Sequence, residues 1–143
     1  MSQSGPSPHL RWDELRCHDA IKTPYPLDWR PSRAHALALV FERIRQATGS
    51  KPIHVVSAYR TAAWNQLVGG SARSQHVQGR ALDLRTPDHL TLGSFWAIVQ
   101  EVARLTPSIG GLGVYDWGVH VDTRPHLDHL ASWDLRAPQS VRA

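Results

Sequence analysis

The sequence predicts a single α+β domain, with a central, mostly antiparallel sheet of about four strands and helices on one side of it. Two short segments, 81–85 and 119–123, alternate between apolar and polar residues as strands do. Two longer segments, 32–48 and 92–105, carry apolar residues at helical spacing. At 143 residues the chain is long enough for one domain with its own hydrophobic core.

The two ends of the chain differ from its middle. Residues 1–9 are rich in Ser and Pro, which favours disorder, and residues 136–143 form a polar tail that we expect to be flexible. The folded domain should therefore span residues 10–135. It should begin with a short helical or turn segment over residues 10–15. The three prolines between residues 21 and 31 predict a loop rather than a regular element.

The first long helix should begin after Ser32, whose hydroxyl can cap it, and end near Thr48, because Gly49 follows. A strand is predicted over residues 53–60, and Thr61 can cap a short helix after it. The apolar stripe of the first long helix consists of Leu37, Val40, Phe41 and Ile44.

The residues that carry chemistry lie in two motifs. The first reads Ser-Gln-His-Val-Gln-Gly-Arg-Ala-Leu-Asp over residues 74–83, and the second reads Gly-Val-His-Val-Asp over residues 118–122. Gly79 lets the chain turn into a strand that places Asp83 on its polar face. In the second motif the strand period puts His120 and Asp122 on one face.

A catalytic zinc ion typically has three His or carboxylate ligands and a fourth position for water or substrate. His76, Asp83 and His120 fit this set, so we predict that they bind one zinc ion. The other histidines are expected to be ordinary surface or core residues: His9, His18, His35, His54, His89, His126 and His129.

The two motifs together resemble the zinc D-Ala-D-Ala carboxypeptidase family, which includes murein endopeptidases and phage endolysins and shares its fold with the hedgehog signalling domain. The resemblance extends from about Leu10 to Trp133. It implies a hedgehog-like fold with zinc in a cleft on the exposed face of the sheet. It also implies zinc-dependent hydrolysis of peptide bonds in peptidoglycan, by removal of a terminal D-Ala or by cleavage of a crosslink or the L-Ala-D-Glu bond.

Two residues outside the zinc ligands also match the family. Residues 57–61, Ser-Ala-Tyr-Arg-Thr, resemble its Ser-x-Tyr-Arg-Ser/Thr stretch, which implies that Arg60 binds the substrate carbonyl or carboxylate near the metal. A guanidinium suits an oxygen that becomes negative during the reaction, although a surface salt bridge is the alternative role. Ser74 resembles the family serine that hydrogen-bonds the substrate, and a hydroxyl that stabilises the loop is the alternative.

The sequence leaves the general base open. Several branches of the family have an acidic residue three positions before the last histidine, where this chain has Trp117. Asp116 is our first candidate and Asp122 the second, and both share the face of the last histidine if the strand is regular. Asp122 can instead accept a hydrogen bond from a ligand imidazole and fix its tautomer. His126 or His129, folded back to the site, is a further alternative.

The charge and the cysteine content of the chain limit which partners and which disulfide bonds are expected. The formal net charge is +4, but the arginines are spread along the chain with no basic block and no nucleic-acid motif, so we expect no nucleic-acid partner. A polyanionic cell wall explains a mild positive charge equally well. Cys17 is the single cysteine, so no internal disulfide can form. We expect a monomer. A non-catalytic, zinc-stabilised module that binds cell wall is the alternative function.

The sequence also gives expectations about location. No stretch approaches the eighteen apolar residues that a membrane-spanning helix needs. The first eight residues lack the pattern of a secretory signal peptide. We therefore expect synthesis in the cytoplasm and access to the cell wall by lysis, by a holin or on a phage particle.

Overall fold

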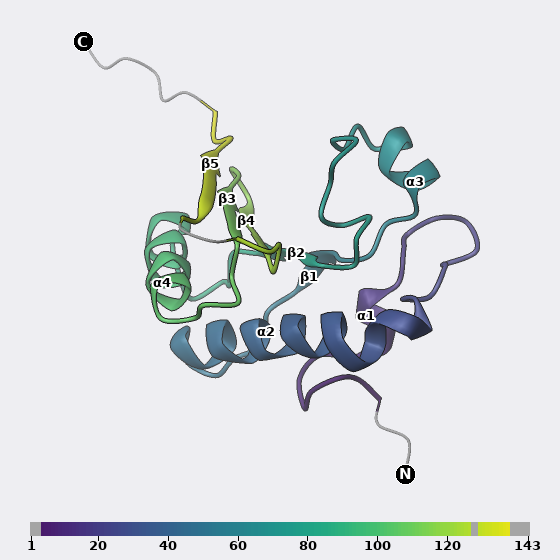
Figure 1. Ribbon diagram of the computed structural model, residues 1–143. Coiled ribbons are helices and arrows are strands. Elements are labelled where there is room, and N and C mark those ends of the chain that lie inside the picture. Colours follow the sequence, from purple (N-terminus) through teal and green to yellow (C-terminus); the bar gives the residue numbers. More distant parts are fainter. Residues whose placement is uncertain (1–3, 127–128, 138–143) are drawn as a thin grey trace.

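The computed structural model describes residues 4–126 and 129–137 (Figure 1). Its centre is one five-stranded sheet with the strand order β1-β2-β4-β3-β5. The strands are β1 (Val55–Ser57), β2 (Ala81–Arg85), β3 (Gly111–Val114), β4 (Gly118–Asp122) and β5 (Ala131–Asp134). Only β3 and β5 pair in parallel, so the sheet is mostly antiparallel, as expected.

Strand β5 is the fifth strand, which the sequence did not predict. It is four residues long, and its side chains alternate between half-buried and exposed. So short a segment has too weak an apolar pattern to be recognised as a strand. Trp133 lies within it, and its ring lies 4.9 Å from the ring of His120 on the same sheet.

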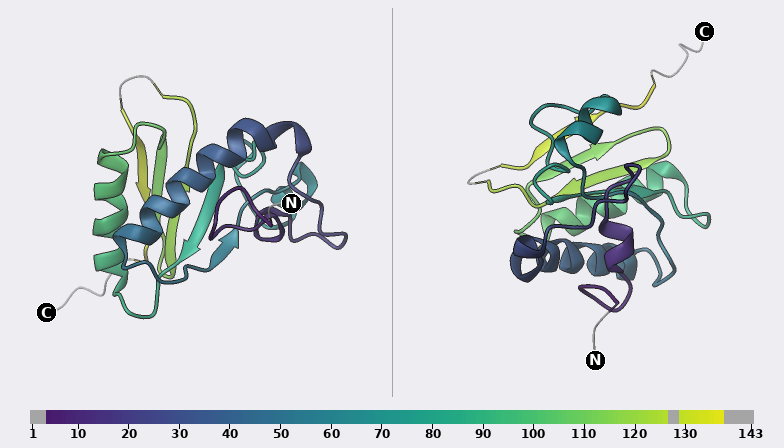
Figure 2. Two further views of the ribbon diagram at one scale, coloured as in Figure 1. Left: turned by 90° about the horizontal axis from the view of Figure 1, so that it is seen from below. Right: turned by 90° about the vertical axis from the view of Figure 1, so that its right-hand side faces the viewer.

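Four α-helices accompany the sheet in the described residues: α1 (Trp12–Leu15), α2 (His35–Ala47), α3 (Ala62–Leu67) and α4 (Leu92–Arg104). In the right-hand view of Figure 2, α2 and α4 lie on one side of the sheet and α3 lies on the other. Thr61 caps α3 as predicted, because its hydroxyl accepts a hydrogen bond from the Trp64 amide at 3.1 Å. No helix of the described residues is long and apolar enough to cross a membrane.

The start of α2 differs from the prediction. A short 3-10 turn, Leu27–Trp29, leads into a π-helical turn, Arg30–Ala34, which continues into α2 without a side-chain cap. Ser32 therefore lies inside this turn and does not cap the helix. The chain is already helical before Ser32, so the first free amides of the helical stretch lie upstream of it.

The hydrophobic core lies between the sheet and the two long helices. Leu82 and Leu84 of β2 and Val119 and Val121 of β4 are fully buried against the helices. Alternate residues of the same two strands face the other way, which places their polar side chains on the opposite face. The apolar residues that α2 and α4 add to this core are Leu37, Ala38, Val40, Phe41, Ile44, Phe95, Val99, Val102 and Ala103.

The segment 4–9, which the sequence analysis expected to be disordered, contacts α2 and α1. The Ser7 hydroxyl donates to the Glu42 carboxylate at 2.6 Å, and the His9 amide donates to it at 2.9 Å. The Trp12 amide donates to the Ser4 carbonyl at 2.8 Å. One acidic side chain on α2 therefore holds a segment whose composition alone favours disorder. The expectations for residues 1–3 and 138–143 lie outside the described residues.

Candidate metal centre

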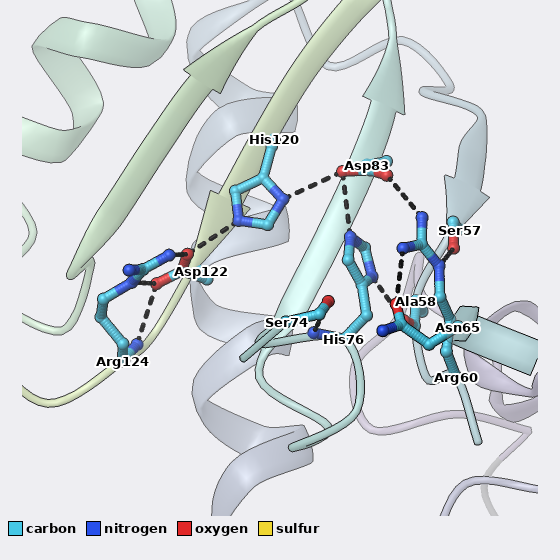
Figure 3. A network of polar contacts seen from close by, with 10 residues as sticks. All are labelled: Ser57, Ala58, Arg60, Asn65, Ser74, His76, Asp83, His120, Asp122 and Arg124. Atoms are coloured by element: carbon cyan, nitrogen blue, oxygen red, sulfur yellow. Dashed lines mark hydrogen bonds and ion pairs between the residues drawn. The ribbon is translucent and has the colours of Figure 1, made fainter. Parts of the chain in front are cut away.

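The polar face of β2 and β4 brings together residues from the two sequence motifs. Asp83 on β2 pairs directly with His120 on β4 in the antiparallel register. His76 reaches them from the turn that precedes β2, as Figure 3 shows. The three side chains are buried, and one nitrogen or oxygen atom of each lies within 4.8 Å of the others. They are therefore close enough to hold a metal ion.

The Asp83 Oδ1 atom lies at the centre of this cluster. It is 3.2 Å from His76 Nε2 and 3.1 Å from His120 Nδ1. In a tetrahedral zinc site with bonds of about 2.0–2.2 Å, neighbouring ligand atoms are about 3.3–3.6 Å apart. Both distances from Asp83 Oδ1 are close to that value, and one nitrogen of each imidazole lies within 4.8 Å of the other, so the three side chains can hold the ion.

The turn before β2 aims His76 at this point. Gly79 has a φ of 67°, a conformation that favours glycine. A Cβ atom at Gly79 would also lie only 2.6 Å from the Trp29 ring. The Tyr25 hydroxyl donates a hydrogen bond to the Gly79 carbonyl, which stabilises the turn. The glycine that the sequence analysis assigned to this turn is thus required by both conformation and space.

The tautomer of His76 leaves a free lone pair in the cluster. Its Nδ1 atom is 2.6 Å from the Ala58 carbonyl oxygen, which can only accept, so Nδ1 carries the proton. Nε2 then faces Asp83 Oδ1 at 3.2 Å, but this contact does not have hydrogen-bond geometry, and Nε2 has no other partner among the described residues. Burial lowers the pKa of His76, which favours the neutral ring. Two buried acceptors facing each other are costly unless a cation lies between them.

His120 is held between two carboxylates. Its Nε2 atom is 2.7 Å from Asp122 Oδ2, and its Nδ1 atom faces Asp83. Burial alone would lower the pKa of His120, but hydrogen bonds to Asp122 and Asp83 outweigh it and raise the pKa. Without metal the ring can donate from both nitrogens. A metal ion at Nδ1 would replace the proton on that nitrogen. Nε2 would keep its proton and donate it in a hydrogen bond to Asp122.

Asp122 is fully buried behind His120 and is engaged on both oxygens. It accepts hydrogen bonds from the Arg124 amide at 3.1 Å and from the Arg124 guanidinium at 2.9 and 2.7 Å. Burial raises the pKa of Asp122, but the bonds from Arg124 and His120 outweigh this and lower it to about 2. Space for this carboxylate comes from Gly111, where a Cβ atom would lie 2.3 Å from Asp122 Oδ2. This geometry matches the predicted role of fixing the imidazole tautomer.

Arg60 lies beside the cluster on the Asp83 side. Its guanidinium donates to the Ser57 hydroxyl at 3.1 Å and to the Asn65 side-chain oxygen at 3.2 Å. It also approaches Asp83 Oδ2 at 3.4 Å, with only 16% of the Arg60 side chain exposed. Asn65, which the sequence analysis did not single out, donates in turn to the Ser71 carbonyl at 2.8 Å. Arg60 is thus a partly buried group of the site rather than a surface ion pair.

The cleft over the cluster has a volume of about 590 Å³, and both Arg60 and Ser74 line it. The Ser74 hydroxyl accepts a hydrogen bond from the His76 amide at 3.1 Å, so it stabilises the loop as well. Three aromatic side chains, which we call the aromatic wall, also line the cleft. Tyr115 and Trp117 stack with centroids 5.1 Å apart, and Trp133 lies 4.9 Å from the His120 ring. Sequence reasoning missed this aromatic wall.

Asp116 does not join the cluster. It lies in the exposed turn between β3 and β4, where its side chain accepts a hydrogen bond from the Ala137 amide at 2.9 Å. β4 begins only at Gly118, so the strand period on which the Asp116 prediction depended does not extend back to this residue. Tyr115 and Trp117 face the cleft instead, on either side of Asp116.

The two later histidines also lie away from the cluster. His126 is exposed, and its Nε2 atom is 2.9 Å from the Pro107 carbonyl oxygen. His129 is exposed as well. Neither lines the cleft over the metal cluster. Among the cleft-lining residues in the described part of the chain, Asp83 is the single carboxylate.

Comparison with known proteins agrees with this site. The model of the Peptidase M15 family matches residues 8–122, a range that includes the whole cluster. A segment of 55 residues, 37% of this chain, is 40% identical to the zinc D-Ala-D-Ala carboxypeptidase of Streptomyces albus G. That segment covers 22% of the relative's own length. Because the family model spans well over half of the chain, the protein belongs to the peptidase M15 family.

Proposed function

We propose that the protein is a zinc peptidase that hydrolyses peptide bonds in peptidoglycan stem peptides or crosslinks. The observation that carries the proposal is the buried cluster in which two imidazole nitrogens and one carboxylate oxygen converge. Membership of a peptidase family supports the reaction class. The relative from Streptomyces albus G, whose name describes a zinc enzyme for D-Ala-D-Ala, supports both the metal and the substrate class.

In this proposal His76 Nε2, Asp83 Oδ1 and His120 Nδ1 hold the zinc ion. When bound, zinc polarises the scissile carbonyl and activates water. The chain itself prepares these ligands: the Ala58 carbonyl and the Asp122 carboxylate each hold the far nitrogen of one ring. The two remaining nitrogens, His76 Nε2 and His120 Nδ1, therefore both face Asp83 Oδ1.

Arg60 is proposed to bind the substrate carbonyl or terminal carboxylate. Ser57 and Asn65 each accept one hydrogen bond from its guanidinium, which fixes the plane of this group at the edge of the cleft. A planar, permanently charged donor held in place suits an oxygen that gains negative charge as the carbonyl is attacked. Ser74 can add a second donor from the adjacent loop, because it also lines the cleft.

The proton acceptor is proposed to be Asp116, because the turn that carries it borders the cleft through Tyr115 and Trp117. Contacts of a general base often tighten only once substrate is bound, so exposure without substrate does not disqualify it. Asp122 is proposed instead to hold His120, because all of its acceptor positions face Arg124 and His120. Asp116→Asn should retain zinc and lose turnover, and full turnover in this variant would show that another group takes the proton.

The function is tested by incubating the zinc-loaded protein with defined muropeptides and identifying the fragments by mass spectrometry. Loss of a terminal D-Ala would identify a carboxypeptidase, and cleavage at an internal bond would identify an endopeptidase. His76→Ala and His120→Ala should lose zinc and turnover together. His54→Ala, at an exposed histidine outside the cleft, is the matched control and should retain both.

One observation favours a second function, a zinc-stabilised module that binds cell wall without cutting it. Asp83 is the single carboxylate among the described residues that line the cleft, and Trp117 occupies the position of the expected acid. Purified sacculi separate the two functions. The enzyme releases new amine ends that a chelator suppresses, whereas the binding module is retained on sacculi without releasing any.

A further inference from the structure

A second groove, with a volume of about 590 Å³, lies beside the metal cleft. It is formed where the turn before α2, the residue before β2 and the segment after β4 meet. Each of these segments contributes one arginine to its wall: Arg33, Arg80 and Arg124. No Asp or Glu side chain is among the residues that line it in the described part of the chain. Within the described residues, the lining of the groove therefore carries positive charge and no carboxylate.

Arg33 and Arg80 are held in place by backbone carbonyls. Arg33 donates to the Gln78 carbonyl at 2.7 Å and stacks on the Trp29 ring, with its guanidinium carbon 4.3 Å from the ring centroid. Arg80 donates to the Thr123 carbonyl at 3.3 Å. Within residues 4–126 and 129–137, neither forms an ion pair with a carboxylate. Both side chains keep donors for a further acceptor.

The charge of Arg33 also disfavours the charged form of Arg80. Burial lowers the pKa of Arg80, and the nearby charge of Arg33 lowers it further. Like charges held close together in a groove raise the local potential for anions. Such an arrangement costs stability in the free protein, and an anionic ligand between the two guanidinium groups would relieve it.

Arg124 connects this groove to the metal cleft, because it lines both. Its own charge is compensated by Asp122, as Figure 3 shows, so it forms a shared wall rather than a third free cation. The cleft and the groove therefore meet at the Arg124 side chain. Among the described residues, the groove arginines without a carboxylate partner are Arg33 and Arg80.

We propose that the groove is a subsite for a free carboxylate of the peptide substrate, remote from the bond that is cut. The proposal rests on the proposed function, because it takes the ligand to be a stem peptide whose glutamate residue keeps one unmodified carboxylate. Arg33 and Arg80 bind that carboxylate from two sides. They would make the protein selective for peptides with a free acid over peptides in which the acid is amidated.

The test compares two synthetic stem peptides that differ only in a free or an amidated glutamate carboxylate. Each is titrated into the zinc-loaded protein while the Nε–H signals of Arg33 and Arg80 are followed by NMR. We expect about tenfold tighter binding of the free acid, which is typical for the loss of one charge-assisted contact. Arg33→Gln and Arg80→Gln should each reduce this preference to about twofold or less.

Conservative and control variants separate recognition from folding. Arg80→Lys retains the charge and should retain most of the preference. Arg85→Gln removes an equal charge from an exposed position on β2 outside the groove and should leave the preference unchanged. Thermal unfolding of each variant shows whether it is folded. A wild-type protein that binds both peptides equally, or variants that keep the full preference, would overturn the proposal.

The same titration distinguishes failure of this proposal from failure of the proposed function. If the peptides are cut but binding does not depend on the carboxylate, the subsite proposal is wrong and the proposed peptidase function is retained. If no peptide is cut but the carboxylate preference depends on Arg33 and Arg80, the subsite proposal is retained and the proposed peptidase function is wrong. A glycerol phosphate oligomer that binds at these arginines more tightly than the free-acid peptide would assign the groove to a phosphate polymer and overturn the proposal.

Discussion

Replacement of Asp122 by Asn tests whether this carboxylate holds the candidate metal centre together. The carboxylate accepts one hydrogen bond from His120 and three from Arg124 while fully buried. An amide has almost the same shape but only one acceptor atom. Its NH₂ group must then face a donor, either the His120 ring or Arg124. The tautomer of His120 is no longer fixed by a charge.

These contacts determine how much the Asp122→Asn variant should lose in zinc affinity and in stability of the metal-free fold. Loss of a hydrogen-bonding partner of this kind typically lowers metal affinity by about 10–100-fold, which corresponds to about 1.4–2.8 kcal/mol. The metal-free fold should lose about 2–3 kcal/mol, because hydrogen bonds to charged groups contribute about 1.5–3 kcal/mol and Arg124 stays partly accessible to water. For a domain of this size that loss lowers the melting temperature by about 6–10 °C.

Zinc affinity is measured by competition with a chromogenic chelator, and stability by calorimetry of the metal-free protein. Asp134→Asn is the matched control, because Asp134 pairs with Arg136 in the same Asp-x-Arg arrangement but on the surface. Surface pairs contribute little to stability, so this variant should change neither quantity measurably. An Asp122→Asn protein that binds zinc as tightly as the wild type would refute the role assigned to Asp122.

Three further variants test other parts of the structure. Glu42→Gln should lower the free energy of unfolding by about 1 kcal/mol near neutral pH, because the residue anchors His9 and the N-terminal segment. Burial raises the pKa of Glu42, but its hydrogen bonds outweigh this and lower it from 4.5, so the difference should disappear in denaturation curves as the pH falls through the lowered value. Gly111→Ala places a Cβ atom 2.3 Å from Asp122 Oδ2, so chelator competition should show weaker zinc binding while the fold survives. Arg60→Ala should keep about one zinc per chain, measured by mass spectrometry, and slow turnover by at least about tenfold.

The part of the site that depends on strand periodicity could be predicted from the sequence. Alternation in residues 81–85 and 119–123 predicts which side chains face the polar side. The antiparallel register then places Asp83 opposite His120. The glycine at position 79 indicated the turn that delivers His76 to the same face. These are local rules, and local rules are the ones that a single sequence expresses most directly.

Other features could not be predicted, because they depend on contacts distant in the chain or on where a strand begins. The Asp116 prediction assumed a regular strand, but a turn separates this residue from β4. Asn65 supports Arg60 from a helix whose sequence has no catalytic motif. The order of residues 4–9 depends on Glu42, more than thirty positions away. None of these contacts leaves a periodic signal in the sequence.

The central claim is that His76, Asp83 and His120 bind one zinc ion through specific atoms. Anomalous diffraction from crystals grown with zinc, recorded on both sides of the zinc absorption edge, tests it most directly. We predict one strong peak at about 2.0–2.2 Å from His76 Nε2, Asp83 Oδ1 and His120 Nδ1. A peak located elsewhere, or a His120 ring turned so that Nε2 meets the metal, would contradict this account.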